Sequence, residues 1–102
     1  MAEFKCYVCL EKVSTGEKFT FTKSGAVHFD CFIANRRKEV GQKHGEILSD
    51  LAVILDSELS HLLALLRIEA HNEEAKKLLS FKYKEIEKTC GETTKIISNL
   101  TN

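Results

Sequence analysis

The chain has 102 residues, 43% hydrophobic and 29% charged, which suits one compact domain or a small module with an extension and is too short for a two-domain enzyme. Fifteen Lys and Arg residues balance fifteen Asp and Glu residues, and this neutral total does not favour a strongly basic nucleic-acid-binding protein. The sequence has neither a long apolar run nor a signal-peptide pattern, so we expect a cytoplasmic protein without a membrane span, whose four cysteines stay reduced.

Two segments of different character follow one another, and Gly41 and Gly45 mark the boundary between them. Residues 1–45 hold three of the four cysteines and carry eight basic and five acidic residues, a net charge of +3. Residues 46–102 carry seven basic and ten acidic residues, a net charge of −3, and show helical periodicity. We therefore predict a finger-like domain over residues 1–45 and a helical segment over residues 46–102.

The first segment contains a predicted β-hairpin. Residues 17–22 alternate with period two, which places Phe19 and Phe21 on one face of a strand. Lys23-Ser24-Gly25 is typical of a turn, and residues 26–28 can return as the second strand. A short helix is expected over residues 30–40.

The second segment is predicted to be a pair of long helices. Over residues 46–71, ten apolar side chains cover an arc of roughly 180° at the helical period. Asn72 can cap a second helix, in which apolar positions recur at alternating spacings of four and three, and Gly91 and Thr93 are expected to weaken its end. The predicted fold class is α+β, mostly α: a small zinc-bound β-hairpin finger with a short helix, followed by a long antiparallel helical hairpin.

The clearest chemical signal is the pattern C-x2-C-x18-H-x2-C, formed by Cys6, Cys9, His28 and Cys31. A two-residue spacing lets one turn of backbone present both ligands of a pair to one ion, and three thiolates with one imidazole complete a tetrahedral zinc shell. We predict one structural Zn2+ per chain, with no open position for catalysis. Cys31 is expected in the first turn of a helix, where the helix dipole favours its thiolate. A redox dithiol at Cys6 and Cys9 is the alternative, but it would need a βαβ context.

These residues also carry a family resemblance. The Cys6-x2-Cys9 pair, the hairpin and His28-Phe29-Asp30-Cys31-Phe32 resemble the first zinc module of a LIM domain, a treble-clef-like finger. A LIM domain continues with a second four-ligand module, which does not follow here. The chain resembles more closely a family of small, functionally uncharacterised archaeal proteins, in which one such finger precedes a leucine-rich helical tail. The resemblance implies zinc binding and no established activity.

A basic patch on the predicted finger helix comprises Arg36, Arg37 and Lys38. These side chains could contact nucleic-acid phosphates or a partner protein. The other interpretation is a solvated helix face, with basic residues favoured near the helix C-terminus.

A few further residues have two interpretations. Glu58 and His61 have the Glu-x-x-His spacing of di-iron helical bundles, but the motif occurs once, and we favour a Glu58 carboxylate that pairs with a Lys or Tyr of the next helix. Cys90 is interpreted as a small packed side chain. No catalytic set, phosphate loop or dinucleotide fingerprint occurs, so we do not expect an enzyme.

The leading functional hypothesis is a zinc-stabilised protein–protein interaction module with an unknown protein partner. Because one hairpin neighbour cannot cover the whole leucine-rich arc of residues 46–71, we expect a homodimer in which two hairpins of residues 46–102 form a four-helix bundle. The alternative is a nucleic-acid-binding regulator that uses the basic patch.

Overall fold

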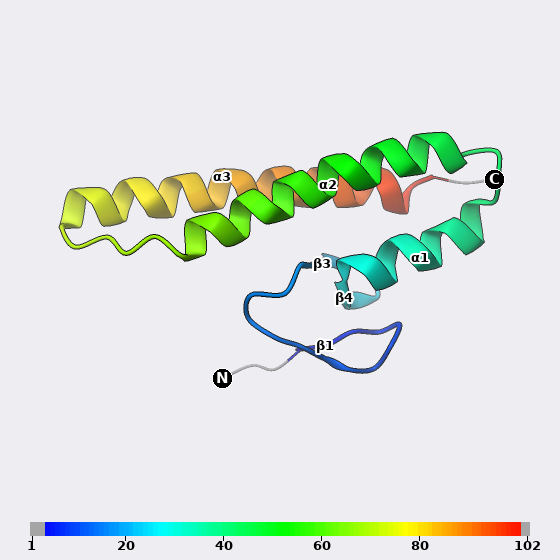
Figure 1. Cartoon of the computed structure of the whole chain (residues 1–102), viewed down its shortest axis with the longest axis horizontal. Helices are drawn as coiled ribbons and strands as arrows, with labels where there is room; N and C mark the ends of the chain where they lie inside the picture. Colours follow the sequence, from blue (N-terminus) through cyan, green and yellow to red (C-terminus); the bar gives the residue numbers. More distant parts are fainter. Residues whose placement is uncertain (1–3, 101–102) are drawn as a thin grey trace.

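The computed structural model describes residues 4–100 of the chain. Two small antiparallel hairpins lead into three helices, so the predicted α+β, mostly α class is confirmed (Figure 1). The elements are, in chain order, β1 (Phe4–Lys5), β2 (Lys12–Val13), β3 (Phe19–Thr22), β4 (Gly25–His28), α1 (Phe29–Val40), α2 (Gly45–Leu66) and α3 (Glu73–Ser98). No helix within the described residues is long and apolar enough to cross a membrane.

The predicted hairpin is confirmed as β3 and β4, which pair from Phe19 opposite His28 to Thr22 opposite Gly25. Gly25 has a φ of 120°, a backbone conformation that glycine adopts without strain, which explains a glycine directly after this turn. The strand β4 runs straight into α1 at Phe29. This direct junction positions His28 and Cys31 on either side of the start of the helix.

The helices α2 and α3 form the antiparallel hairpin that the periodicity predicts (Figure 1). The prediction that the first long helix extends to residue 71 is wrong, because α2 ends at Leu66. There the N–H groups of Arg67 and Ile68 donate to the carbonyls three residues earlier in the chain. Such tight bonds close the last helical turn. Asn72 caps α3 as predicted, because its side-chain oxygen accepts a hydrogen bond from the Ala75 N–H at 2.7 Å.

The end of α3 is stronger than its sequence indicates. The helix continues through Gly91 to Ser98, because Thr93, Thr94 and Ile97 are buried against the rest of the chain. The Thr94 hydroxyl also donates a hydrogen bond to the Cys90 carbonyl at 2.8 Å. Tertiary packing here overrides a weak intrinsic helix propensity.

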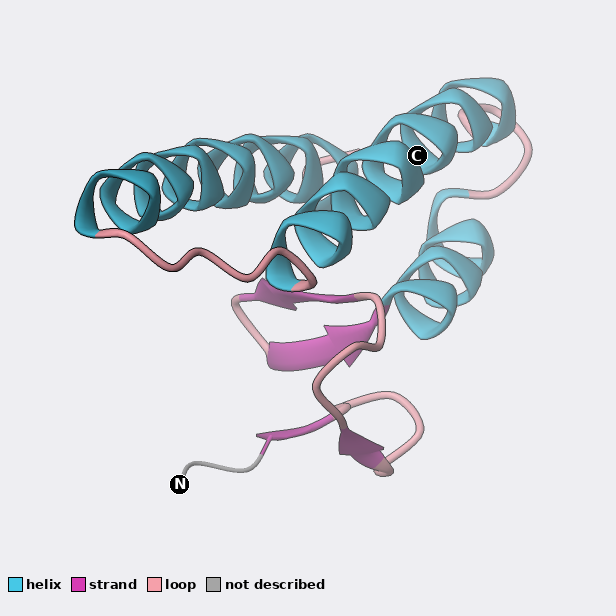
Figure 2. Cartoon of the chain, turned by 60° about the vertical axis from the view of Figure 1, so that its left-hand side comes forward, coloured by secondary structure: helices cyan, strands magenta, loops and turns pink. Residues whose placement is uncertain are grey.

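The finger packs on the helical hairpin through the face of β3 that carries Thr20, not through the face that carries Phe19 and Phe21. Figure 2 shows the β3–β4 hairpin against the underside of the helices. Thr20 is buried and shares a 2.7 Å hydrogen bond with Thr94, whereas Phe21 on the opposite strand face is 52% exposed. The ammonium of Lys18 contacts the Asp56 carboxylate of α2 at 2.5 Å. Polar contacts thus join the two segments beside the apolar core.

The leucine-rich arc of α2 is divided between core and solvent. Its buried members are Leu48, Leu55 and Leu59, which join side chains of α1, β4 and α3 in one core. Ile47 and Ile54 remain about half exposed, at 49% and 48%. The chain therefore covers the centre of the arc and leaves its flank in solvent.

Candidate metal centre

The structure brings Cys6, Cys9, His28 and Cys31 together, with their ligand atoms all within 4.8 Å of one another. The Cys9 Sγ lies 3.4 Å from the His28 Nδ1, and the Cys31 Sγ lies 4.0 Å from it. Ligand atoms of a tetrahedral zinc site lie roughly 3.5–3.8 Å apart, given Zn–S near 2.3 Å and Zn–N near 2.0 Å. The spacing and donor chemistry therefore fit one zinc ion.

The first two ligands lie on a tight loop between β1 and β2. The Leu10 N–H donates to the Cys6 carbonyl at 2.8 Å, and Leu10 adopts a φ of 64° that reverses the chain. The Tyr7 N–H donates to the Ala26 carbonyl at 3.1 Å, which fixes this loop against β4. The backbone of one hairpin thus holds the Cys6–Cys9 pair close to the His28–Cys31 pair.

The His28 ring is oriented by an outer contact. Its Nε2 donates to the Lys12 carbonyl at 3.2 Å and lies 3.6 Å from the Glu17 carboxylate. A proton on Nε2 leaves the Nδ1 lone pair free for a metal, and such carbonyl or carboxylate partners are usual behind metal-bound histidines. Glu17 is itself held by the Ser14 N–H at 2.7 Å. The short Ser14–Glu17 spacing fits their local contact, but no local pattern places Glu17 beside His28.

The thiols of the cluster differ in acidity. Burial opposes charge on Cys6, but the backbone N–H groups of Cys9, His28 and Val8 outweigh it and lower the pKa of Cys6 to about 6. Burial, followed by contacts with the Cys9 and Cys6 thiols, raises the pKa of Cys31 to about 12. Cys31 lies in the first turn of α1 as predicted, but burial and the neighbouring thiols, rather than the helix dipole, set the direction of its pKa shift. Neighbouring thiolates repel one another unless a cation lies between them.

All four ligands come from the protein, so the cluster can hold a structural zinc, and a bound ion would join the β1–β2 loop, β4 and α1. Cys6 is fully buried, whereas Cys9 is exposed. One side of the centre thus lies near the surface. No other group of three or more Cys, His, Asp or Glu residues within positions 4–100 has a spacing that suits a metal.

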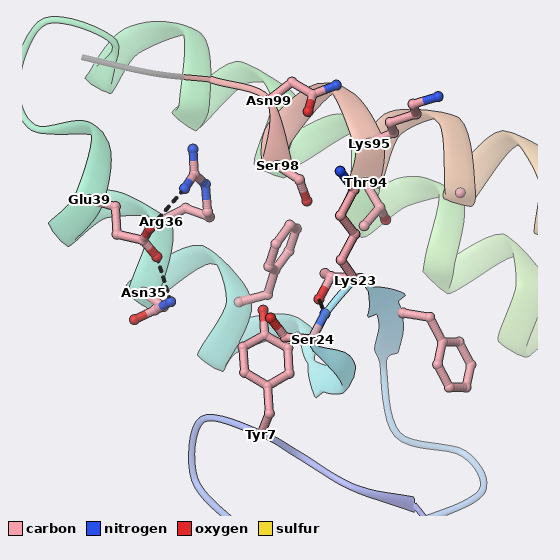
Figure 3. A pocket seen from close by; sticks show the side chains of 14 residues that line it. Tyr7, Lys23, Ser24, Asn35, Arg36, Glu39, Thr94, Lys95, Ser98 and Asn99 are labelled. Atoms are coloured by element: carbon pink, nitrogen blue, oxygen red, sulfur yellow. Dashed lines mark hydrogen bonds and ion pairs between the residues drawn. The ribbon is translucent and has the colours of Figure 1, made fainter.

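Of the basic patch on α1, Arg36 does not lie on a solvated helix face, so the interpretation of the whole patch as a solvated face is wrong for this residue. Its guanidinium donates to the carbonyls of Ile97, at 3.2 Å from Nε, and of Leu100, and it pairs with Glu39 at 3.2 Å. The Glu39 carboxylate also accepts a 2.8 Å bond from Asn35 (Figure 3). Arg36 thus binds α1 to the C-terminal end of α3, a contact that sequence proximity could not reveal.

The other two residues of the basic patch are exposed. Arg37 donates to the Ser49 hydroxyl of α2 at 3.2 Å, and Lys38 lies on the solvent side of α1. With Arg36 committed to α3, the patch presents fewer free charges than its sequence indicates.

Glu58 and His61 do not form a second cluster in the structure. The Glu58 Oε1 is buried without a hydrogen-bond partner among the described residues, whereas His61 is exposed. Cys90 is buried between the helices, as its interpretation as a packed side chain expects. Burial, followed by the Glu58 carboxylate, raises the pKa of Cys90 to about 11.

Comparison with protein families matches residues 2–99 to DUF2175, described as an uncharacterized protein conserved in archaea. No solved structure matches the chain.

Proposed function

The chain belongs to the archaeal DUF2175 family, and we propose that it is a zinc-stabilised protein-interaction module that dimerises through its helical hairpin. The observation that carries the zinc part is the convergence of Cys6, Cys9, His28 and Cys31 within 4.8 Å. A loop, a hairpin and a helix start that each contribute to one four-ligand centre support the treble-clef, LIM-like resemblance. The proposal includes no catalytic step.

An apolar surface on the hairpin supports the dimerisation part. On α2, Ile47 and Ile54 lie roughly 180° and 160° around the axis from Asp56, which contacts the finger, at 100° per residue. On α3, Leu78 and Ile96 both lie roughly 160° from Thr94, which also contacts the finger. These four residues define the outer face of the hairpin, opposite the finger.

The outer face is exposed to a degree that favours association. Its four side chains are 48–62% exposed, and all are large and apolar. Full burial of an exposed side chain of this size contributes about 1.5–3 kcal/mol, so covering the exposed half of each contributes about 1 kcal/mol before the entropy cost of association. A second copy placed face to face would form a four-helix bundle with both fingers outside it.

Sedimentation equilibrium tests the proposal. The parent chain should sediment at twice its 11.6 kDa mass at micromolar concentration, and Ile54→Glu should yield a folded monomer. Val53→Glu is the matched control, because Val53 is 68% exposed and lies only about 60° from Asp56, away from the outer face. A parent that remains monomeric at high concentration would contradict dimerisation.

Nucleic-acid binding is the second candidate, supported by the exposed positions of Arg37 and Lys38. If these side chains contact phosphates, affinity for duplex DNA should fall steeply with salt, and Arg37→Gln with Lys38→Gln should weaken binding. A parent that binds no DNA at low salt would contradict this function.

A further inference from the structure

A groove of about 580 Å³ lies where the finger meets the C-terminal half of α2 and the middle of α3. Its walls are largely apolar and include Phe19, Phe21, Leu63, Leu66 and Tyr83. The volume falls within the roughly 300–1,000 Å³ that ligand sites occupy. This groove lies on the finger side of α3 and is therefore separate from the outer face.

The groove has an exposed aromatic edge. Phe4, Phe21 and Phe19 form a row of edge-to-face contacts, with ring centroids 5.2 Å and 5.5 Å apart. Phe4 and Phe21 are 43% and 52% exposed, and Leu66 across the groove is 50% exposed. Rigid aromatic side chains beside an apolar hollow are typical of the residues that dominate binding energy in protein interfaces.

The helical spacing of the lining residues defines the shape of a fitting partner. On α2 the groove is lined at positions 59, 62, 63 and 66, and on α3 at positions 83, 87, 90 and 91. These spacings of three and four residues form one ridge on each helix, with a furrow between the ridges. A third helix can lay an apolar stripe along such a furrow.

The charged residues at the groove indicate which charge a binding partner should carry. Glu87 lines the groove, and within residues 4–100 no basic side chain pairs with its carboxylate. Burial, and then the nearby Glu87 carboxylate, raises the pKa of Tyr83. The other two charged residues of the lining are engaged elsewhere: the Glu17 carboxylate accepts from the Ser14 N–H and lies near His28, and the Lys18 ammonium is paired with Asp56. The exposed Glu87 carboxylate at the groove therefore favours a basic residue on the partner.

We propose that this groove binds an amphipathic helix of another protein, with apolar side chains against Leu63, Leu66 and Phe21 and a Lys or Arg facing Glu87. This inference rests on the proposed interaction function and names the class of partner. The groove and the outer face are distinct, so a dimer could hold one such helix per chain.

Two synthetic peptides of about 18 residues test the inference, one built from Leu and Lys and one from Leu and Glu in the same amphipathic pattern. The zinc-loaded full chain would be titrated against each fluorescein-labelled peptide at about 0.15 M salt, with anisotropy as the readout. We expect the Leu/Lys peptide to bind at least tenfold more tightly than the Leu/Glu peptide. Leu66→Asn should weaken binding of the Leu/Lys peptide about tenfold relative to the parent chain, whereas Leu78→Asn on the outer face should not weaken it.

Glu87→Gln isolates the charge. This variant should lower the affinity for the Leu/Lys peptide about two- to fivefold, which is the effect expected from the loss of one exposed ion pair. It should not lower the affinity for the Leu/Glu peptide. Equal affinity for both peptides, no effect of Leu66→Asn, or an equal loss in Leu78→Asn would each overturn the inference. Zinc content and sedimentation mass measured on the same samples separate this failure from failure of the proposed module or dimer.

Discussion

The strands and loops of the finger bury different kinds of side chain from the helical hairpin. Within the strands and loops of the finger, the buried apolar residues are small: Cys6, Val13, Ala26 and Val27. Its large aromatic side chains Phe4 and Phe21 face solvent. The hairpin instead buries Leu48, Leu55, Leu59 and Ile97 along regular helical stripes. Periodic apolar contact therefore explains the packing of the hairpin and of α1, which buries Phe32 and Ile33, whereas the strands and loops of the finger bury little apolar surface and bring four ligands together instead.

Removal of the metal should produce the largest difference between the two regions. Cys9→Ser, or a strong chelator, should unfold the finger, because apparent zinc-binding energies of roughly 10–16 kcal/mol support small zinc-dependent folds. The strand signals should disappear from NMR spectra, whereas much of the helical circular dichroism should remain. Cys90→Ser serves as the control and should retain one zinc per chain by elemental analysis. Full zinc content in Cys9→Ser would contradict the ligand assignment.

Loss of the Arg36 contact should have the next largest effect, because it joins the two regions. Arg36→Gln removes the guanidinium donor from the carbonyls of Ile97 and Leu100, although the Ile97 carbonyl keeps the Leu100 N–H at 3.2 Å. We expect the free energy of unfolding to decrease by about 2–3 kcal/mol, because the charged Arg36 bonds and the pair with Glu39 are lost together. Arg37→Gln should change it by less than about 0.5 kcal/mol, because Arg37 is exposed. Urea denaturation of both variants measures the difference, and equal destabilisation would argue against the role of Arg36.

The smallest expected effect at neutral pH concerns the Cys90 thiol. The pKa of Cys90 is raised from 9.0 to about 11 in the folded chain, so the folded state retains this proton while the unfolded state loses it. Its contribution to stability is complete below pH 9 and is lost as the pH rises through 11. Cys90→Ala should flatten the pH dependence of the unfolding midpoint in that range. An unchanged profile would show that Cys90 is not the titrating group.

The features of this molecule that depend on local patterns were predicted better than those that depend on contacts between distant residues. The hairpin turn and the Asn72 cap depend on residues close in sequence, and the structure has both. The two ligand pairs converge although Cys9 and His28 are 19 positions apart, and the local two-residue spacing within each pair was enough to identify them. The burial of Thr20 and the position of Arg36 depend on partners near residues 94–100, and no local pattern encodes those partners. The early end of α2 depends on tight bonds at Arg67 and Ile68, residues that are themselves compatible with a helix. Whether residues 1–45 form a domain of their own stays a prediction.

The position of the Arg36 contact has a consequence for the order of events on the ribosome. Arg36 and its carbonyl partners are 61 and 64 residues apart, and Thr20 and Thr94 are 74 residues apart. At about 5–20 residues per second, roughly 3–12 s pass between synthesis of Arg36 and of Ile97. The four zinc ligands, in contrast, are all made by residue 31. The four ligands can therefore come together on the nascent chain before Thr94, Ile97 and Leu100 are made, whereas closure of the finger against α3 must wait for these residues.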